Sequence, residues 1–327
     1  MTVSVPGNIL IAGEYLVLEE GGPGVALALE PRVYARAQPA STWSVEAVMG
    51  RKPLSDGRPA PRWTPGHAEE LPLVEAVFQA AAALWREAGI APQPQATVLD
   101  SSAFFDIDGR KAGFGSSAAT ALALALTLGK AAGLDANQLR AFALKAALLG
   151  HRNAQGGRGS GYDIYASAHG GIGLFSGGAE PRWQALPNLT LPPALLFAGP
   201  APVASSRAVK RFSEWRAGLS TSRASPQKLL ERSRHSALAL AKARDSGEIL
   251  RALAEARLAG IALGDALGVP ALIDTPPALA QAAGRKPLLV KASGAGDELG
   301  MAFFDGQSVA AEGYKELKAT GGPLWLS

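Results

Sequence analysis

A turn of small residues at 113–118, GFGSSA, is the stretch whose residue types most directly suggest chemistry. It runs into alanine and leucine with almost no polar residue, which predicts a buried helix over 116–131. The first backbone N–H groups of a helix lack partners and carry partial positive charge, and glycines let an anion approach them. The turn therefore predicts a phosphate-binding site, and an ordinary serine-capped core helix is the alternative.

Two further glycine turns accompany the first, GGRGSG at 156–161 and SGAG within KASGAGD at 291–297. The turn at 156–161 places Asp163 at the start of a predicted short helix, where it is either a helix cap or a chemical group. The chain has neither a GxxxxGK[ST] loop nor a dinucleotide-binding GxGxxG in a strand-to-helix setting. Three such turns are difficult to explain by packing alone, so they favour an enzyme that binds anions.

A polar cluster in the second half of the chain adds positive charge. Ser205, Ser206 and Arg207 are followed by Lys210, a grouping suited to binding a phosphate or acyl end of a ligand. The alternative is a helix N-cap followed by solvated basic residues.

The predicted elements alternate between strands and helices in both halves of the chain, which favours a two-lobed α/β or α+β enzyme. Strands are predicted at 3–5 and 9–11 with a break at Pro6–Gly7, at 25–29 and 33–37 as a pair, and at 97–99, 104–107, 288–290, 301–304 and 323–326, with LLFAG at 195–199. Helices are predicted at 71–88, 116–131, 137–150, 226–246, 248–267 and 308–319, with a short one after 161. Residues 50–66 read as a loop or hairpin, and 187–193 as a linker.

Composition excludes several other classes of protein. The 327 residues are 47% hydrophobic and 18% charged, which supplies a large core and argues against long disordered tails. There is no cysteine, so disulfides and thiolate metal sites are excluded and a reducing cytoplasm is expected. The net charge is +4, but no run of five Lys or Arg residues indicates nucleic-acid binding. The apolar runs at 118–128 and 194–199 fall short of the roughly 18 residues of a membrane span, and the N-terminus does not resemble a signal peptide.

Three motifs, taken together and in order, carry a family resemblance. VPGNILIAGEYLVLE at 5–19, KAGFGSSAAT at 111–120 and KASGAGDELGMAFF at 291–304 resemble the motifs of the galactokinase–homoserine kinase–mevalonate kinase–phosphomevalonate kinase (GHMP) superfamily. Within it, AQGGRGSGYD at 154–163 and FAGPAPVASSRAV at 197–209 are most similar to phosphomevalonate kinases. The resemblance implies an α+β, two-lobed GHMP kinase fold, with an S5-like α/β ATP-binding lobe over 1–187 and a ferredoxin-like lobe over 188–327. Substrate is expected in the cleft between these lobes.

The resemblance also implies roles for individual residues. Lys111 and Asp163 fall on the catalytic positions, and Ser116 or Ser117 would contribute a hydroxyl to Mg²⁺. The ATP-binding residues would be Gly113, Gly115, Ser116, Ser117 and Ala118. The substrate-binding residues would be Asn8, Glu14, Tyr15, Gln155, Ser160, Ser205, Ser206, Arg207, Ser293, Gly294 and Ala295.

The sequence departs from the family pattern at several positions. Asn8 replaces a usual lysine, and the third motif reads GAGDEL where more glycine is usual. Tyr15 and Arg152 stand where mevalonate kinases have a histidine and a metal-binding glutamate, respectively. The metal site is therefore expected to differ from theirs.

The implied reaction is the ATP-dependent phosphorylation of mevalonate 5-phosphate to the 5-diphosphate, with ATP and Mg²⁺ as cofactors. Mevalonate kinase, or another alcohol kinase of the superfamily, is the alternative within the class. A catalytically idle ligand-binding relative is the alternative outside it. The expected partner is a small anionic substrate, with no nucleic acid or membrane, for a monomer or homodimer.

Overall fold

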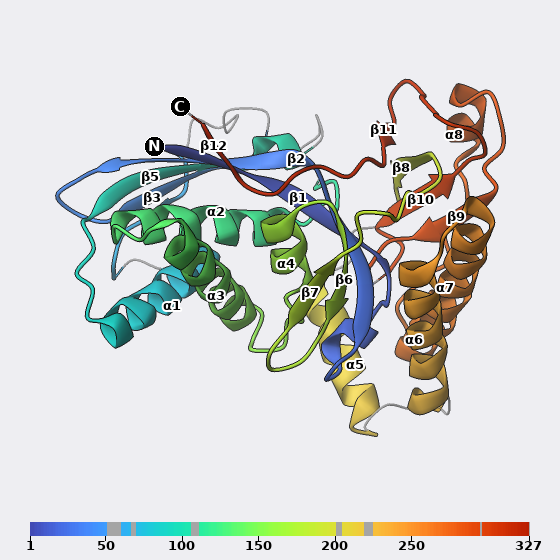
Figure 1. The fold of residues 1–327 in the computed structure, drawn as a ribbon, viewed down its shortest axis with the longest axis horizontal. Coiled ribbons are helices and arrows are strands. Elements are labelled where there is room, and N and C mark those ends of the chain that lie inside the picture. The colour runs from blue at the N-terminus through green and yellow to red at the C-terminus, as the bar shows by residue number, and fades with distance from the viewer. Residues whose placement is uncertain are drawn as a thin grey trace. The chain divides into compact units, whose positions relative to one another are not determined.

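The computed structural model describes residues 1–50, 60–66, 70–105, 111–200, 205–218, 225–294 and 296–326, without the side chains of Ser205 and Ser206. The chain forms two compact units (Figure 1). Unit 1 contains Met1–Asn8, Ala28–Gly170 and Thr320–Ser327, and unit 2 contains Ile9–Leu27 and Gly171–Ala319. Each unit thus collects stretches that are distant in sequence. The expected lobe boundary at residue 187 stays a prediction.

The sheet of unit 1 has the strand order β12-β1-β2-β5-β3-β4. Its strands are β1 (Thr2–Ala12), β2 (Pro23–Pro39), β3 (Ser44–Val48), β4 (Arg62–Trp63), β5 (Gln95–Asp100) and β12 (Leu324–Leu326), the first two of which continue into unit 2. β2 pairs antiparallel with β5, placing Ala37 opposite Thr97, whereas β3 pairs parallel with β5. The C-terminal β12 pairs antiparallel with β1, so both ends of the chain lie in this sheet.

Four helices cover one face of this sheet (Figure 1). They are α1 (Pro72–Ala88), α2 (Ser116–Ala131), α3 (Ala136–Ala154) and α4 (Tyr162–His169). α2 is the central one: every residue from Ala121 to Gly129 is buried. α3 begins with a capping box, in which Asp135 accepts the backbone N–H of Gln138 and the Gln138 side chain returns to the N–H of Asp135. These helices confirm the predictions made from apolar periodicity.

Three sequence predictions in unit 1 and the first strands are wrong. β1 runs without a break through Pro6–Gly7. Gly7 allows close packing instead, since a Cβ there would lie 2.5 Å from the carbonyl oxygen of Phe114. The predicted pair 25–29 and 33–37 is one continuous strand, β2. Residues 102–104 form a short 3₁₀ helix where a strand at 104–107 was predicted, and 106–110 lie outside the described residues.

Unit 2 contains two antiparallel arrangements of strands. The first part of β2 pairs with β6 (Ile172–Ser176), which pairs with β7 (Arg182–Ala185). A separate sheet has the order β11-β8-β10-β9, formed by β8 (Ala194–Ala198), β9 (Leu289–Ala292), β10 (Leu299–Phe303) and β11 (Lys315–Glu316). The helices of unit 2 are α5 (Ser205–Arg216), α6 (Pro226–Lys242), α7 (Ser246–Leu267) and α8 (Pro277–Ala282). A 3₁₀ turn covers Leu16–Leu18 in the same unit. The mixed α and β content confirms the predicted fold class.

The helix predicted at 308–319 is wrong. This segment contains turns and the two-residue strand β11, which pairs with β8. Gly306 and Gly313 adopt φ values of 80° and 82°, a left-handed conformation that interrupts a right-handed helix. Among the described residues, no helix is both long and apolar enough to cross a membrane.

Candidate active site

The first glycine turn leaves the start of α2 open. Gly115 is the N-cap of the helix, with φ 69°, and no side chain caps the helix. The alternative of a serine-capped core helix is therefore wrong. The unpaired N–H groups of the first turn, with the hydroxyls of Ser116 and Ser117 beside them, remain available to an anion.

Asn8 braces this turn from the strand side. Its backbone N–H donates to the carbonyl of Phe114 at 3.0 Å, and its side-chain nitrogen donates to Ser167 of α4 at 3.0 Å and to the carbonyl of Gly115 at 3.4 Å. The side chain is 2% exposed. Asn8 thereby joins β1, the glycine turn and α4, and its expected contact with substrate stays a prediction.

A buried histidine connects the two motifs of unit 1. His151 of α3 is 2% exposed, and its Nε2 lies 3.1 Å from the hydroxyl oxygen of Ser117. Its Nδ1 lies 3.7 Å from Oδ2 of Asp163. The helix cap of α4 is Gly161, so Asp163 is not the N-cap, and its carboxylate lies in the first turn of the helix. Gln155 lies one helical turn after His151, and its amide nitrogen is 3.3 Å from the same Nε2.

Arg152 holds the second glycine turn in place. Its Nε donates to the carbonyl of Gly159 at 2.9 Å, and its terminal nitrogen donates to the carbonyl of Ser160 at 2.8 Å. Burial lowers the pKa of the guanidinium, and the nearby Tyr165 and Asp163 oppose that shift. Arg152 thus orders the loop that leads to Asp163.

The donor set of unit 1 suits a magnesium ion that arrives with a nucleotide. Over the part of the chain that the structure describes, no three His, Cys, Asp or Glu side chains cluster as a metal cage. Mg²⁺ typically takes one or two carboxylates plus phosphate oxygens and water, and the Asp163 carboxylate and a serine hydroxyl are hard oxygen donors of that kind. Lys111 is exposed at the start of the turn, where it forms a β-bridge with Phe105.

In unit 2, the first and third motifs meet in a buried ion pair. The ammonium of Lys291 on β9 donates to Oε1 of Glu14 and, at 2.8 Å, to the carbonyl of Ala292, and the two side chains are 2% and 4% exposed. Burial raises the pKa of Glu14, and Lys291 acts in the opposite direction. Lys291 stands within the third motif, and its local sequence does not indicate this partner. Because Glu14 faces Lys291, its expected contact with substrate stays a prediction.

The same two motifs make a second contact. The hydroxyl of Ser293 donates to the carbonyl of Leu10 at 2.9 Å, and Gly294 follows with φ 72°.

Tyr15 of the first motif adopts φ 61°, is buried, and stacks on Phe212 of α5 with ring centroids 5.6 Å apart. Burial raises the pKa of the Tyr15 hydroxyl. Ala295 lies outside the described residues.

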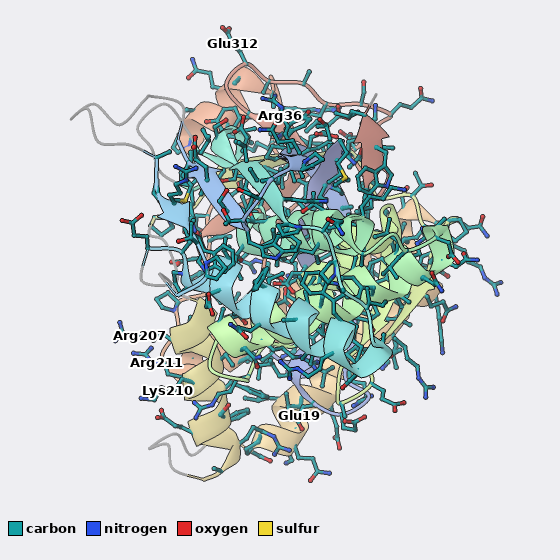
Figure 2. The ribbon with its side chains drawn as sticks, turned by 90° about the vertical axis from the view of Figure 1, so that its left-hand side faces the viewer. Glu19, Arg36, Arg207, Lys210, Arg211 and Glu312 are labelled. Atoms are coloured by element: carbon teal, nitrogen blue, oxygen red, sulfur yellow. The ribbon has the colours of Figure 1, made fainter. Side chains whose placement is uncertain are left out.

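Helix α5 carries several of the basic residues of unit 2. Figure 2 shows Arg207, Lys210 and Arg211 gathered along this helix. Arg207 is exposed, and Lys210 lies 3.8 Å from Glu214 one turn away. Arg211 donates to the carbonyl of Gly268, and Arg216 binds Glu19 at 2.8 Å. The polar cluster predicted from Ser205 to Lys210 therefore lies in the first turns of a helix.

The comparisons with known proteins agree with this arrangement. Residues 75–171, from α1 to the end of α4, match the model of the GHMP kinases N terminal domain. The chain therefore contains this domain and has the fold of the GHMP kinase superfamily. A search of curated protein sequences finds no match to the chain.

Solved structures with this fold include enzymes and a protein without a stated activity. The Lin0012 protein from Listeria innocua has a TM-score of 0.79 and 20% identity, with 99% of each chain covered. Phosphomevalonate kinase from Streptococcus pneumoniae, in complex with phosphomevalonate and AMPPNP, has a TM-score of 0.72 and 16% identity, covering 97% of this chain and 100% of that one. Galactokinase from Lactococcus lactis, complexed with galactose, has a TM-score of 0.63 and 15% identity, covering 93% and 85%.

The packing of Asn8 on the turn predicts the effect of adding one methyl group. A Cβ on Gly115 would lie 2.3 to 2.6 Å from atoms of the Asn8 side chain, in a backbone conformation with φ 69°. Gly89 has φ 65° but open space around the same position, so it is the matched control. We expect Gly89→Ala to cost about 1–2 kcal/mol from the backbone alone, and Gly115→Ala about 1–3 kcal/mol more from overpacking.

Chemical denaturation of both variants measures this difference. Adding Asn8→Ala to Gly115→Ala should recover part of the loss, because it removes the atoms that clash. Equal destabilisation by the two glycine substitutions would contradict the close packing of the Asn8 side chain on Gly115.

The buried pair of unit 2 predicts a different pattern. Glu14→Met or Lys291→Met alone leaves an uncompensated buried charge and should cost about 3–5 kcal/mol, whereas the double variant should cost less than either. The exposed pair Arg232–Glu255, 3.1 Å apart in the same unit, is the control: Glu255→Met should cost less than about 1 kcal/mol. The measurement is the free energy of unfolding, and a double variant as destabilised as the sum of the singles would refute the pairing.

Proposed function

We propose that this chain is an ATP-dependent kinase that transfers the γ-phosphoryl group to mevalonate 5-phosphate, giving the 5-diphosphate. The observation that carries the proposal is the uncapped start of α2, with Ser117 linked through His151 to Asp163. The similar fold of a phosphomevalonate kinase bound to phosphomevalonate and AMPPNP supports this choice of substrate.

These residues would act mainly by positioning the phosphate groups and neutralising their charge. The N–H groups at residues 115–118 would bind the ATP phosphates, and the exposed Lys111 would neutralise charge on the phosphoryl group in transfer. Mg²⁺, when bound, would neutralise further phosphate charge through oxygen ligands. An oxygen of the acceptor phosphate attacks the γ-phosphorus, the bond to the bridging β–γ oxygen breaks, and ADP leaves.

The role of Asp163 depends on the acceptor. A phosphate monoester has a second pKa of about 6, so near neutral pH its attacking oxygen is mostly deprotonated on arrival. A general base then adds little, and Asp163 would orient Lys111 and the metal ion. An alcohol acceptor would instead need Asp163 as the base.

The basic residues of α5 support an anionic acceptor. Arg207 is exposed, and an exposed guanidinium can bind a phosphate with two parallel hydrogen bonds. We propose Ser205, Ser206 and Arg207, with Ser293 and Gly294, as the substrate-binding residues of unit 2. Cytoplasmic location and a monomeric or homodimeric state belong to the same proposal.

Mevalonate kinase activity is the second candidate. The neighbours of similar fold include an L. major mevalonate kinase in complex with R-mevalonate, with a TM-score of 0.59 and 14% identity, covering 95% of this chain and 87% of that one. The first-turn position of Asp163 is compatible with a general base.

A substrate panel separates the two candidates. Purified protein with ATP and Mg²⁺ should show a kcat/KM for phosphomevalonate roughly 10- to 100-fold above that for mevalonate. The reason is that mevalonate lacks the charged 5-phosphate that the proposed site would bind. Homoserine and galactose complete the panel. Turnover of mevalonate that equals or exceeds that of phosphomevalonate would replace the proposal with the second candidate. Absence of any ATP consumption would indicate a ligand-binding relative.

Lys111→Met tests the charge neutralisation. Because the cation would act mostly on the transition state, kcat should fall by about 100-fold or more while KM changes little. Lys130→Met is the control, since Lys130 is an exposed lysine in the last turn of the same helix that Lys111 precedes. A Lys111→Met variant with a kcat near that of the parent would assign the role to another cation.

A further inference from the structure

Unit 1 contains a groove that the proposed reaction does not use. The groove has a volume of about 350 Å³, within the range of sites that bind small molecules. Its first lining residue on α2 is Leu122, whereas the helix begins at Ser116. A helix rises about 1.5 Å per residue, so the groove starts about 9 Å along α2 from the glycine turn and extends away from it. It is therefore separate from the proposed nucleotide site.

The walls of the groove are apolar and come from four elements. Leu122 and Leu126 lie one turn apart on α2. Leu139 lines the groove from α3, and Ala168 lines it from the end of α4. Trp325 of β12 also lines the groove and is 43% exposed. A small molecule bound here would therefore bury apolar surface on several sides.

One cation gives the groove a net positive charge. Lys130 and Asp135 both line it, and their opposite charges balance in number. The carboxylate of Asp135 also accepts two backbone N–H groups as the cap of α3. Arg140 remains: it is exposed, and none of the described carboxylates forms an ion pair with it. Burial lowers the pKa of the nearby His169, and the charge of Arg140 lowers it further, which is the effect of a cation without a counterion.

We propose that this groove binds a small amphipathic carboxylate, whose apolar body lies along Leu122, Leu126 and Trp325 and whose carboxylate binds Arg140. A guanidinium holds a carboxylate with two parallel hydrogen bonds. The single net positive charge matches a monoanion better than a phosphate monoester, whose charge is about −1.5 to −2 near neutral pH. The ligand is neither the nucleotide nor the acceptor, so the proposal does not rest on the proposed kinase function.

Simple probes separate the apolar body from the charge. Octanoate carries both features, octylammonium has the same chain with the opposite charge, and acetate has the carboxylate alone. We expect calorimetry to show octanoate binding at least about tenfold more tightly than either control, with affinity rising about fourfold for each further methylene buried between butanoate and octanoate. Saturating AMPPNP should leave the octanoate affinity unchanged. Equal binding of octylammonium, or displacement of octanoate by AMPPNP, would overturn the proposal.

Arg140→Gln tests the cation, and Lys145→Gln is its matched control. Both residues are exposed on α3, but Lys145 does not line the groove and lies 3.7 Å from Glu87. We expect Arg140→Gln to weaken octanoate binding about fivefold, as for loss of a good exposed ion pair, and Lys145→Gln to leave it within about twofold. Equal octanoate affinity in the two variants would refute the role of Arg140.

Trp325 reports where the apolar chain lies. The chain has six tryptophans, so Trp325→Phe identifies the Trp325 indole signal by its absence from the NMR spectrum. We expect nuclear Overhauser contacts between the octanoate methylenes and this indole. Contacts with other tryptophans alone would place the ligand elsewhere and overturn the proposal.

Sedimentation velocity, with and without octanoate, tests a second copy of the chain as the occupant of the groove. We expect the sedimentation coefficient to be unchanged by octanoate. A dimer that octanoate dissociates would show that a second copy covers the groove, and the proposal would be wrong. None of these measurements includes phosphoryl transfer, so failure of phosphomevalonate turnover with these results as expected would remove the proposed function alone.

Discussion

The bare start of α2 is the constraint on which the rest of unit 1 depends. The N-cap is a glycine in the left-handed conformation, so no side chain caps the first N–H groups of the helix. Such a turn has little to hold its shape by itself. Asn8 supplies that support from β1, with hydrogen bonds to the turn and to α4, and its side chain occupies the space where a Cβ of Gly115 would lie.

Burial explains why so much of the helix is alanine and leucine. α2 is buried from Ala121 to Gly129, so packing over several turns fixes the open turn at its start. The polar groups then converge from neighbouring helices: His151 from α3 connects Ser117 and Asp163, and Arg152, the next residue, holds the second glycine turn. Adjacent residues of one helix thus support the two motifs in different ways.

The first motif serves both units. Asn8 is the last residue of the N-terminal stretch in unit 1, and Glu14 belongs to unit 2, where it forms a buried ion pair with Lys291. A pair of this kind is costly to break and is weak evidence for added stability, so its value is in specifying one arrangement of the first and third motifs. Ser293 makes the same connection through the carbonyl of Leu10.

Local sequence determined the helices α1 to α4, α6 and α7, the open glycine turn and the position of Asp163 at a helix start, because apolar periodicity, glycine and capping residues act over a few neighbours. Only the tertiary structure decided the rest. β1 and β2 run through apparent breaks because their residues satisfy packing from distant segments, and 308–319 is not helical, because β11 pairs with β8 across more than a hundred residues. The roles of Asn8, His151 and Lys291 could not be read locally, since each depends on partners from other elements, and a side chain's own neighbours in sequence do not report which distant donor or acceptor it will face.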